Sequence, residues 1–182
     1  MITFQPTDLS GVFVVEPELI SDPRGLFGRT YCRREFDEVG LAFSPVQCSI
    51  SSNLRNGTMR GLHYQTPPWE EDKLVRCTRG AAFDVAADVR PASPTFGKWA
   101  GVELTAENRR GLYLPAGVAH GFQTLMDATE MLYLVSAFYE PESQRGVRWD
   151  DPLLGIDWPI SPPTVVSDRD RALPFLTVEG LS

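Results

Sequence analysis

The chain has 182 residues, of which 42% are hydrophobic and 10% aromatic, and we expect residues 1–182 to form a single domain with a substantial core. Its formal net charge of −7 and pI near 4.8 oppose the long-range attraction that nucleic acid or an anionic membrane surface requires. Both are therefore excluded as expected partners, whereas a small anion could still bind through a local group of arginines.

Targeting and cysteine patterns favour an intracellular protein. The first residues, MITFQPTDLSGVFVV, contain no basic leader ahead of an apolar run, and no later segment offers eighteen uncharged apolar residues. Cys32, Cys48 and Cys77 form an odd, widely spaced set that fits neither a disulfide framework nor a CxxC metal site. We expect a cytoplasmic chain with reduced thiols and no membrane segment.

Short strand-like segments make up most of the chain. Gly and Pro contribute 15 residues each and separate segments rich in β-branched and aromatic residues, some of them alternating, as Val85, Ala87 and Val89 alternate with Asp84 and Asp88. Strands are predicted over residues 11–20, 46–53, 59–65, 73–80, 81–89, 99–106, 111–117, 120–126 and 131–139. This spacing predicts an all-β fold, an antiparallel jelly-roll sandwich or barrel.

Two short helices and one long loop complete the prediction. The segment CRREFDEVG places Phe36 and Val39 three residues apart and ends on Gly40, which predicts a short helix with a glycine stop. The segment SDRDRALPFL predicts a single turn before a proline. After residue 140 the sequence is dense in Pro, Trp and Asp without periodicity, so we expect an ordered loop packed over the sheet and held by Trp149 and Trp158.

The two histidines lie in strand-like segments whose spacing resembles the metal-binding segments of small cupin barrels. The first cupin segment is matched in spacing by Gly57, His63, Gln65 and Glu70. His120 occupies the position of the later histidine. In cupins the first segment usually carries His-x-His and a Glu, which bind a transition metal with the later His. Because Gln65 replaces the second histidine here, the ligand set is poor, and we expect neither a metal nor another cofactor.

Without a metal, two interpretations of the histidines remain. An imidazole titrates near neutral pH, so it can accept a proton from a carbon next to a ketone when a carboxylate orients it. Alternatively, His63 and His120 are hydrogen-bonded core residues with no role in chemistry.

Motifs along residues 10–172 favour proton transfer. In order, they are DPRGLFGRTY, RGLHYQ, KLVRCTRGAAFDVAADVRPASPTFGKW, PAGVAHGFQTL, YEPESQRGVRWDDPLLGIDWP and SDRD. Their content and order resemble the dTDP-4-dehydrorhamnose 3,5-epimerase family. The resemblance implies a cupin-type jelly roll without metal that acts as a homodimer on a nucleotide-linked 4-keto-6-deoxyhexose.

The same resemblance implies roles for individual residues. His63 matches the general base and Asp170 the carboxylate that polarises it. Lys73 matches the cation that stabilises the enolate, and Tyr133 matches the acid that returns a proton from the opposite face. His120 matches a histidine beside the site.

Structural alternatives exist for two of these residues. Ser167 and Asp170 have the spacing of a capping box, so the carboxylate could cap a turn. Tyr133 could be an aromatic residue of a half-buried strand, in which case another residue, such as Tyr139, would be the acid.

Nucleotide binding is the less regular part of the resemblance. Arg24 and Arg60 match residues that bind the diphosphate from both subunits, with Gln47 nearby, and Arg145 is a further expected substrate contact. An exposed strand-end charge is the alternative for Arg60.

Three positions depart from the family pattern. Arg29 stands where a glutamate usually helps to read the base, Ser49 replaces an asparagine, and Phe138 stands where a tyrosine often lines the nucleotide pocket. Arg29 could instead point to solvent or pair with an acid such as Glu35.

We therefore expect an isomerase that moves protons at C3, C5 or both of a dTDP-4-keto-6-deoxyhexose in deoxysugar biosynthesis. A single-centre epimerase on another nucleotide's sugar is a second possibility. A sugar-nucleotide-binding barrel without catalysis is a third, and solvent deuterium exchange distinguishes it from the enzymes.

Overall fold

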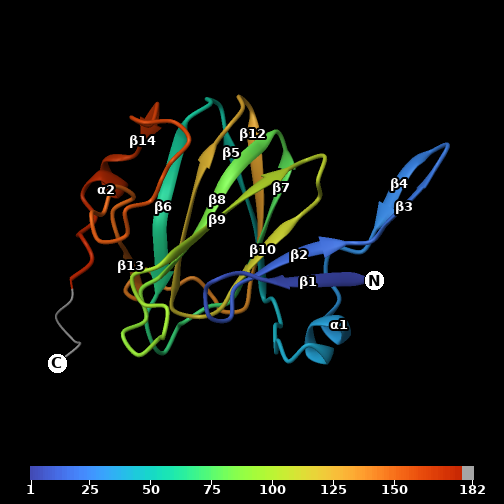
Figure 1. Ribbon diagram of the computed structural model, residues 1–182, viewed down its shortest axis with the longest axis horizontal. Helices are drawn as coiled ribbons and strands as arrows, with labels where there is room; N and C mark the ends of the chain where they lie inside the picture. The colour runs from blue at the N-terminus through green and yellow to red at the C-terminus, as the bar shows by residue number, and fades with distance from the viewer. Residues whose placement is uncertain (178–182) are drawn as a thin grey trace.

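Two antiparallel β-sheets pack face to face in the computed structural model, which describes residues 1–177 (Figure 1). The first sheet has the order β1 (Ile2–Pro6), β2 (Phe13–Pro17), β10 (Gly111–Leu114), β7 (Lys73–Arg79), β12 (Thr129–Val135), β5 (Gln47–Asn53). The second has the order β13 (Gln144–Gly146), β6 (Thr58–Gln65), β11 (Val118–Thr124), β8 (Ala81–Asp88), β9 (Trp99–Thr105), with β14 (Val165–Val166) parallel to β6. The predicted all-β, cupin-type sandwich is confirmed.

Apolar side chains from both sheets form the core between them. This cluster includes Leu112, Leu114, Phe122 and Met131, each no more than 1% exposed. Because successive side chains of a strand point to opposite faces, β8 contributes alternate residues to two different layers.

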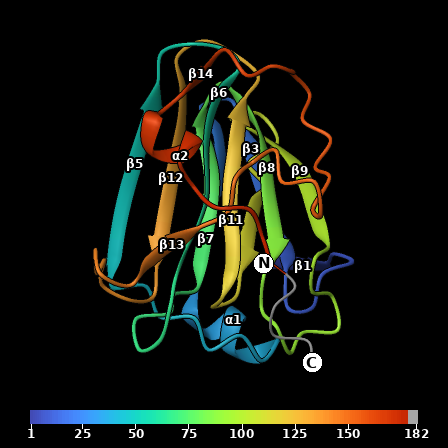
Figure 2. The same ribbon diagram turned by 90° about the vertical axis from the view of Figure 1, so that its left-hand side faces the viewer.

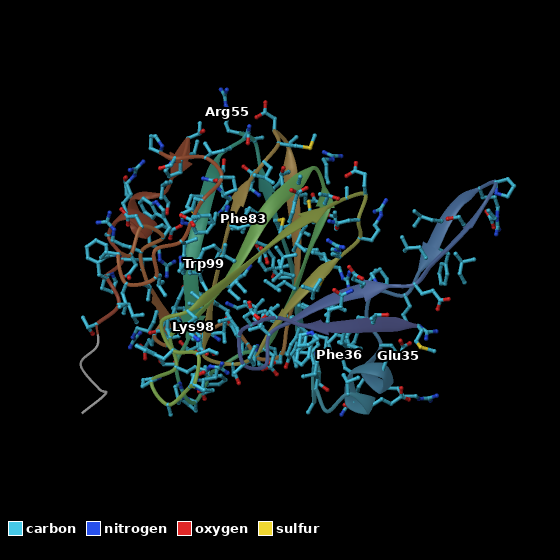
Figure 3. The ribbon with its side chains drawn as sticks, in the orientation of Figure 1. Glu35, Phe36, Arg55, Phe83, Lys98 and Trp99 are labelled. Carbon is cyan, nitrogen blue, oxygen red and sulfur yellow. The ribbon has the colours of Figure 1, made fainter. Side chains whose placement is uncertain are left out.

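A second apolar layer covers the outer face of the second sheet. Val85 and Ala87 of β8 pack there with Leu154, and the segment after β13 crosses this face (Figure 2). Phe83 lies next to Trp99, with ring centroids 6.4 Å apart (Figure 3). The segment is ordered, as predicted.

Two tryptophans hold this covering segment. The indole N–H of Trp158 donates to the backbone oxygen of Trp149 at 2.8 Å, and Trp149 packs with Met59 of β6 and Val166 of β14. Because this segment is fixed on β6, it delivers the following residues to the same strand.

The two helices are short and lie where the sequence predicts them. Helix α1 (Arg33–Glu38) buries Phe36, and it ends before Gly40, whose φ of +80° suits glycine (Figure 3). Helix α2 (Asp168–Arg171) is the predicted single turn and begins after Ser167. No helix within residues 1–177 is long and apolar enough to cross a membrane.

Several strands go beyond the prediction. The expected strand over residues 11–20 is interrupted at Glu18 and divides into β2 and the start of a hairpin made of β3 (Leu19–Asp22) and β4 (Gly25–Gly28). This hairpin projects from the body of the sandwich (Figure 1). Strand β1, which pairs with β2, and the short strands β13 and β14 also lie outside the predicted segments.

Candidate active site

A cavity of about 370 Å³ lies between the two sheets and brings all four expected catalytic residues together. Its walls come from β6 and β11 of one sheet, from β5, β7 and β12 of the other, and from the region of α2. The lining residues are Ser51, Arg60, His63, Tyr64, Gln65, Glu71, Lys73, His120, Phe122, Tyr133, Tyr139, Gln144, Ser167, Arg169 and Asp170.

His63 and Asp170 form a hydrogen-bonded pair in this cavity. Nε2 of His63 lies 2.8 Å from Oδ1 of Asp170, and the backbone N–H of Gly61 donates to Oδ2 at 3.2 Å. Ser167 Oγ accepts the backbone N–H of Asp170 at 3.1 Å and so caps α2 with its own hydroxyl. The carboxylate of Asp170 therefore faces His63 and β6.

Glycine at position 61 allows this approach. Its φ is +111°, and a Cβ there would lie 2.6 Å from Cα of Gly121 on the neighbouring strand β11. The backbone N–H of Gly61 is thus available to the carboxylate of Asp170 at a point where a side chain on β6 would collide with β11.

The carboxylate of Asp170 is held in its charged form. Burial by itself raises the pKa of Asp170, but the hydrogen bond and charge of His63, together with the N–H of Gly61, outweigh it and hold the pKa below its ordinary value. With 29% of the His63 side chain exposed and only 6% of the Asp170 side chain exposed, the imidazole faces the cavity and the carboxylate lies behind it. This arrangement suits an imidazole that accepts a proton while a fixed anion stabilises the imidazolium.

Tyr133 faces the same cavity from the opposite sheet. It lies on β12, whereas His63 lies on β6, so a ligand between the sheets meets the phenol and the imidazole on opposite sides. Burial, and then the negative charge of Asp84, raise the pKa of Tyr133 well above its ordinary value. The phenol is therefore protonated at neutral pH and suited to donate a proton.

His120 belongs to a second histidine–carboxylate pair. It is the direct cross-strand partner of His63, on β11, and its Nε2 lies 2.9 Å from Oδ1 of the fully buried Asp84. The His120 ring also packs edge-on against Tyr133, with ring centroids 5.8 Å apart. His120 thus lines the cavity and is at the same time a hydrogen-bonded buried histidine.

Lys73, the expected cation, lies beside His63. Lys73 begins β7, and its Nζ donates to the backbone oxygen of His63 at 3.3 Å and lies 2.9 Å from Oε1 of Glu71. The cupin-type spacing assigned the glutamate of this region to Glu70, but that residue is exposed and Glu71 lines the cavity. This correction concerns one residue in a loop, where strand periodicity gives no register.

The residues present fit a resident metal poorly. Oε1 of Gln65 accepts the backbone N–H of Glu140 at 2.7 Å, and its Nε2 donates to Glu71, so the amide is already engaged. Among residues 1–177 no three His, Cys, Asp or Glu side chains are grouped so that they could hold a metal ion. His63 and His120 are each paired with a carboxylate, Glu71 is paired with Lys73, and the third histidine of the usual cupin ligand set is replaced by Gln65.

Of the residues expected to contact the nucleotide, some line the cavity and others lie outside it. Arg60 lines the cavity, and its Nε donates to Oδ1 of Asn53 at 2.7 Å. Gln47 lies outside the lining and accepts the backbone N–H of Tyr139 at 2.7 Å. Phe138 is 61% exposed and outside the lining, whereas the neighbouring Tyr139 lines the cavity; a contact of Phe138 with the nucleotide stays a prediction.

Three predicted arginines lie outside the cavity of the single chain. Arg24 sits on the projecting hairpin, where its Nη2 lies 2.5 Å from Oδ2 of Asp22 and 90% of its side chain is exposed. Nη1 of Arg29 donates to Oε1 of Glu35 at 2.8 Å, which is the ion pair considered as its alternative. Arg145 is exposed and its Nη1 donates to neighbouring backbone oxygens.

The cavity also contains polar residues that the sequence did not single out. Oε1 of Gln144 accepts hydrogen bonds from the hydroxyl of Tyr139 and from Nη2 of Arg169, both at 2.5 Å. Arg169 directly precedes Asp170 in the SDRD motif, which was the available signal. Ser51 lies two residues after Ser49 and therefore on the same face of β5, so strand alternation could have indicated it.

Known proteins resemble most of the chain. The family model described as dTDP-4-dehydrorhamnose 3,5-epimerase matches residues 6–177. The enzyme of that name from Sinorhizobium fredii is 45% identical over 177 residues, which cover 95% of this chain and 89% of the relative.

Two further relatives widen the comparison. A dTDP-4-dehydrorhamnose 3-epimerase from Streptomyces niveus is 40% identical, covering 92% of this chain and 80% of its own. The crystal structure of the 3,5-epimerase from Bacillus anthracis, with TDP and PPi bound, has a TM-score of 0.93 at 39% identity and covers 97% of this chain and 100% of its own. The chain belongs to the dTDP-4-dehydrorhamnose 3,5-epimerase family.

Proposed function

We propose that this isomerase removes and returns protons at C3, C5 or both of a dTDP-4-keto-6-deoxyhexose. The observation that carries the proposal is the placement of the His63–Asp170 pair and Tyr133 on opposite walls of one cavity, with Lys73 beside the base. An epimerase needs a base on one face of a carbon and an acid on the other, and this cavity offers both.

The reaction follows from these positions. His63 takes the proton from the carbon next to the C4 ketone, and the electron pair of the C–H bond moves to form an enolate whose charge rests on the ketone oxygen. The ammonium of Lys73 stabilises that charge. Tyr133 then donates its proton to the opposite face of the carbon, the ketone re-forms, and the configuration is inverted.

We also propose that the protein acts as a homodimer through the β3–β4 hairpin. Ile20 and Phe27 of this hairpin are 65% and 72% exposed, and edge strand β5 exposes Ile50 at 63%. Exposed apolar residues grouped on a projecting element are typical of an interface. Such an interface would carry Arg24 toward the cavity of the other protomer, where its guanidinium could bind the diphosphate.

The proposal includes a cytoplasmic location and the number of sugar carbons that are inverted. Cys32, Cys48 and Cys77 are unpaired, which fits a reducing cytoplasm. Since 40% identity links the chain to a 3-epimerase as well as 45% to a 3,5-epimerase, inversion at one centre is the second candidate.

Incubation with dTDP-4-keto-6-deoxyglucose in deuterium oxide tests the function. NMR should detect deuterium at C3, C5 or both, and the positions labelled and inverted give the number of centres. If the protein binds the sugar nucleotide and no deuterium is exchanged, the proposed epimerase activity is rejected and the protein only binds the sugar nucleotide.

A further inference from the structure

Glu71 holds the ammonium of Lys73 in the cavity wall. Oε1 of Glu71 lies 2.9 Å from Nζ of Lys73, and only 11% of the Glu71 side chain and 12% of the Lys73 side chain are exposed. A pair so shielded from solvent is screened little, so its geometry is fixed more firmly than that of a surface ion pair.

Gln65 fixes the other oxygen of Glu71. Nε2 of Gln65 donates to Oε2 of Glu71 at 2.8 Å and to the backbone oxygen of Trp69 at 2.8 Å, while its Oε1 accepts the N–H of Glu140 at 2.7 Å. Gln65 itself is 2% exposed. One carboxylate oxygen of Glu71 therefore accepts a hydrogen bond from the strand that carries His63, and the other forms the ion pair with Lys73.

The contacts of Lys73 leave the ammonium able to donate to a ligand. An ammonium has three N–H groups. One donates to the backbone oxygen of His63 at 3.3 Å, and the ammonium also forms an ion pair with Glu71, so donor capacity remains in the cavity. The ammonium of Lys73 is thus held against the backbone of His63, the residue proposed as the base.

We propose that Glu71, held by Gln65, is a positioning residue that fixes the Lys73 ammonium where the enolate oxygen forms. The inference rests on the proposed function, because the oxygen in question belongs to the reaction intermediate. Its structural half, that Glu71 holds the ammonium, can be measured without any turnover.

Glu71→Gln is the informative variant. A carboxylate accepts at both oxygens, whereas an amide has one acceptor and one donor group. Since Gln65 donates a hydrogen bond to one oxygen of Glu71 and Lys73 pairs with the other, the variant replaces one of these oxygens with an NH₂ group and removes the charge that pairs with Lys73, while keeping the size of the side chain. Glu70→Gln is the matched control, because it removes the same charge from the adjacent, exposed position.

NMR of the protein labelled with ¹⁵N-lysine tests the position of the ammonium directly. The chain has two lysines, and the exposed Lys98 provides an internal reference on the loop before β9 (Figure 3). We expect slow hydrogen exchange at the Lys73 ammonium in the wild type and in Glu70→Gln, and exchange at least about tenfold faster in Glu71→Gln. Equal exchange in all three proteins would overturn the proposal.

Kinetics of the same proteins test the consequence for the reaction. A displaced cation should lower kcat about 10- to 100-fold in Glu71→Gln and leave KM within about twofold, since small misplacements of catalytic groups have costs of this size. If the wild-type enzyme is active and Glu71→Gln has the same kcat, the positioning role is rejected and the proposed function is retained. An inactive wild type would reject the proposed function, and the exchange measurement would still decide whether Glu71 holds the ammonium.

Discussion

The carboxylate of Asp170 offers the sharpest test of how His63 is activated. Asp170→Asn keeps the size of the side chain and removes its charge, so the imidazolium formed during proton transfer loses its anionic partner. With charge centres about 4 Å apart and an effective dielectric constant of about 20, the attraction is about 4 kcal/mol. Because 29% of the His63 side chain is exposed, solvent reduces this to about 2–4 kcal/mol.

This loss corresponds to a decrease in kcat of about 30- to 1,000-fold, since each 1.36 kcal/mol is a factor of ten. The assay is the rate of deuterium incorporation by NMR, together with calorimetric titration of dTDP, whose affinity should stay within about twofold of wild type. Asp168→Asn, on the exposed side of the same helix, is the matched control and should retain full activity. A folded Asp170→Asn protein with wild-type kcat would refute the role of this carboxylate.

Five further outcomes are expected. Because the pKa of Asp170 is lowered in the folded state, its contribution to stability is present above about pH 4 and is lost as the pH falls through its folded pKa. In chemical denaturation, the difference in the free energy of unfolding between wild type and Asp170→Asn should therefore shrink in acid. Tyr133→Phe should still exchange deuterium but retain configuration, and inversion at the wild-type rate would assign the acid elsewhere, for example to Tyr139. Because the pKa of Tyr133 is raised in the folded state, its stabilising contribution is lost as the pH rises above about 10, so thermal melting of Tyr133→Phe should be less sensitive to alkali than that of wild type. Prolonged chelation should change neither turnover nor Tm, whereas a stoichiometric metal with chelator-sensitive turnover would restore the metal-cupin interpretation. Arg24→Ala should weaken dTDP binding about tenfold or more if the hairpin of one protomer serves the other, and unchanged affinity by calorimetry would exclude that contact.

Regular elements with strong local signals were predictable. The alternation in β8 and the glycine after α1 each depend on residues close in sequence, and both are present in the structure. The β3–β4 hairpin was missed because Leu19 and Ile20 continue the apolar character of β2, although Pro17 marks the break at Glu18 and the turn contains Pro23 and Gly25.

The site is predictable only in part, because its contacts are long-range. His63 and Asp170 are 107 residues apart, and nothing local in either segment indicates their 2.8 Å contact; the order of motifs supplied that expectation. Strand β12 ends at Val135, so the alternation of its side chains could not indicate that Tyr139 lines the cavity.

Deuterium incorporation by His63→Ala, compared with the wild type, tests the central claim most directly. The measurement is NMR at C3 and C5 of dTDP-4-keto-6-deoxyglucose in deuterium oxide, with dTDP affinity as the check on folding and binding. If His63 removes the proton, exchange should fall by several powers of ten while dTDP binding stays nearly unchanged. Undiminished exchange in His63→Ala would contradict the account and remove His63 from the mechanism.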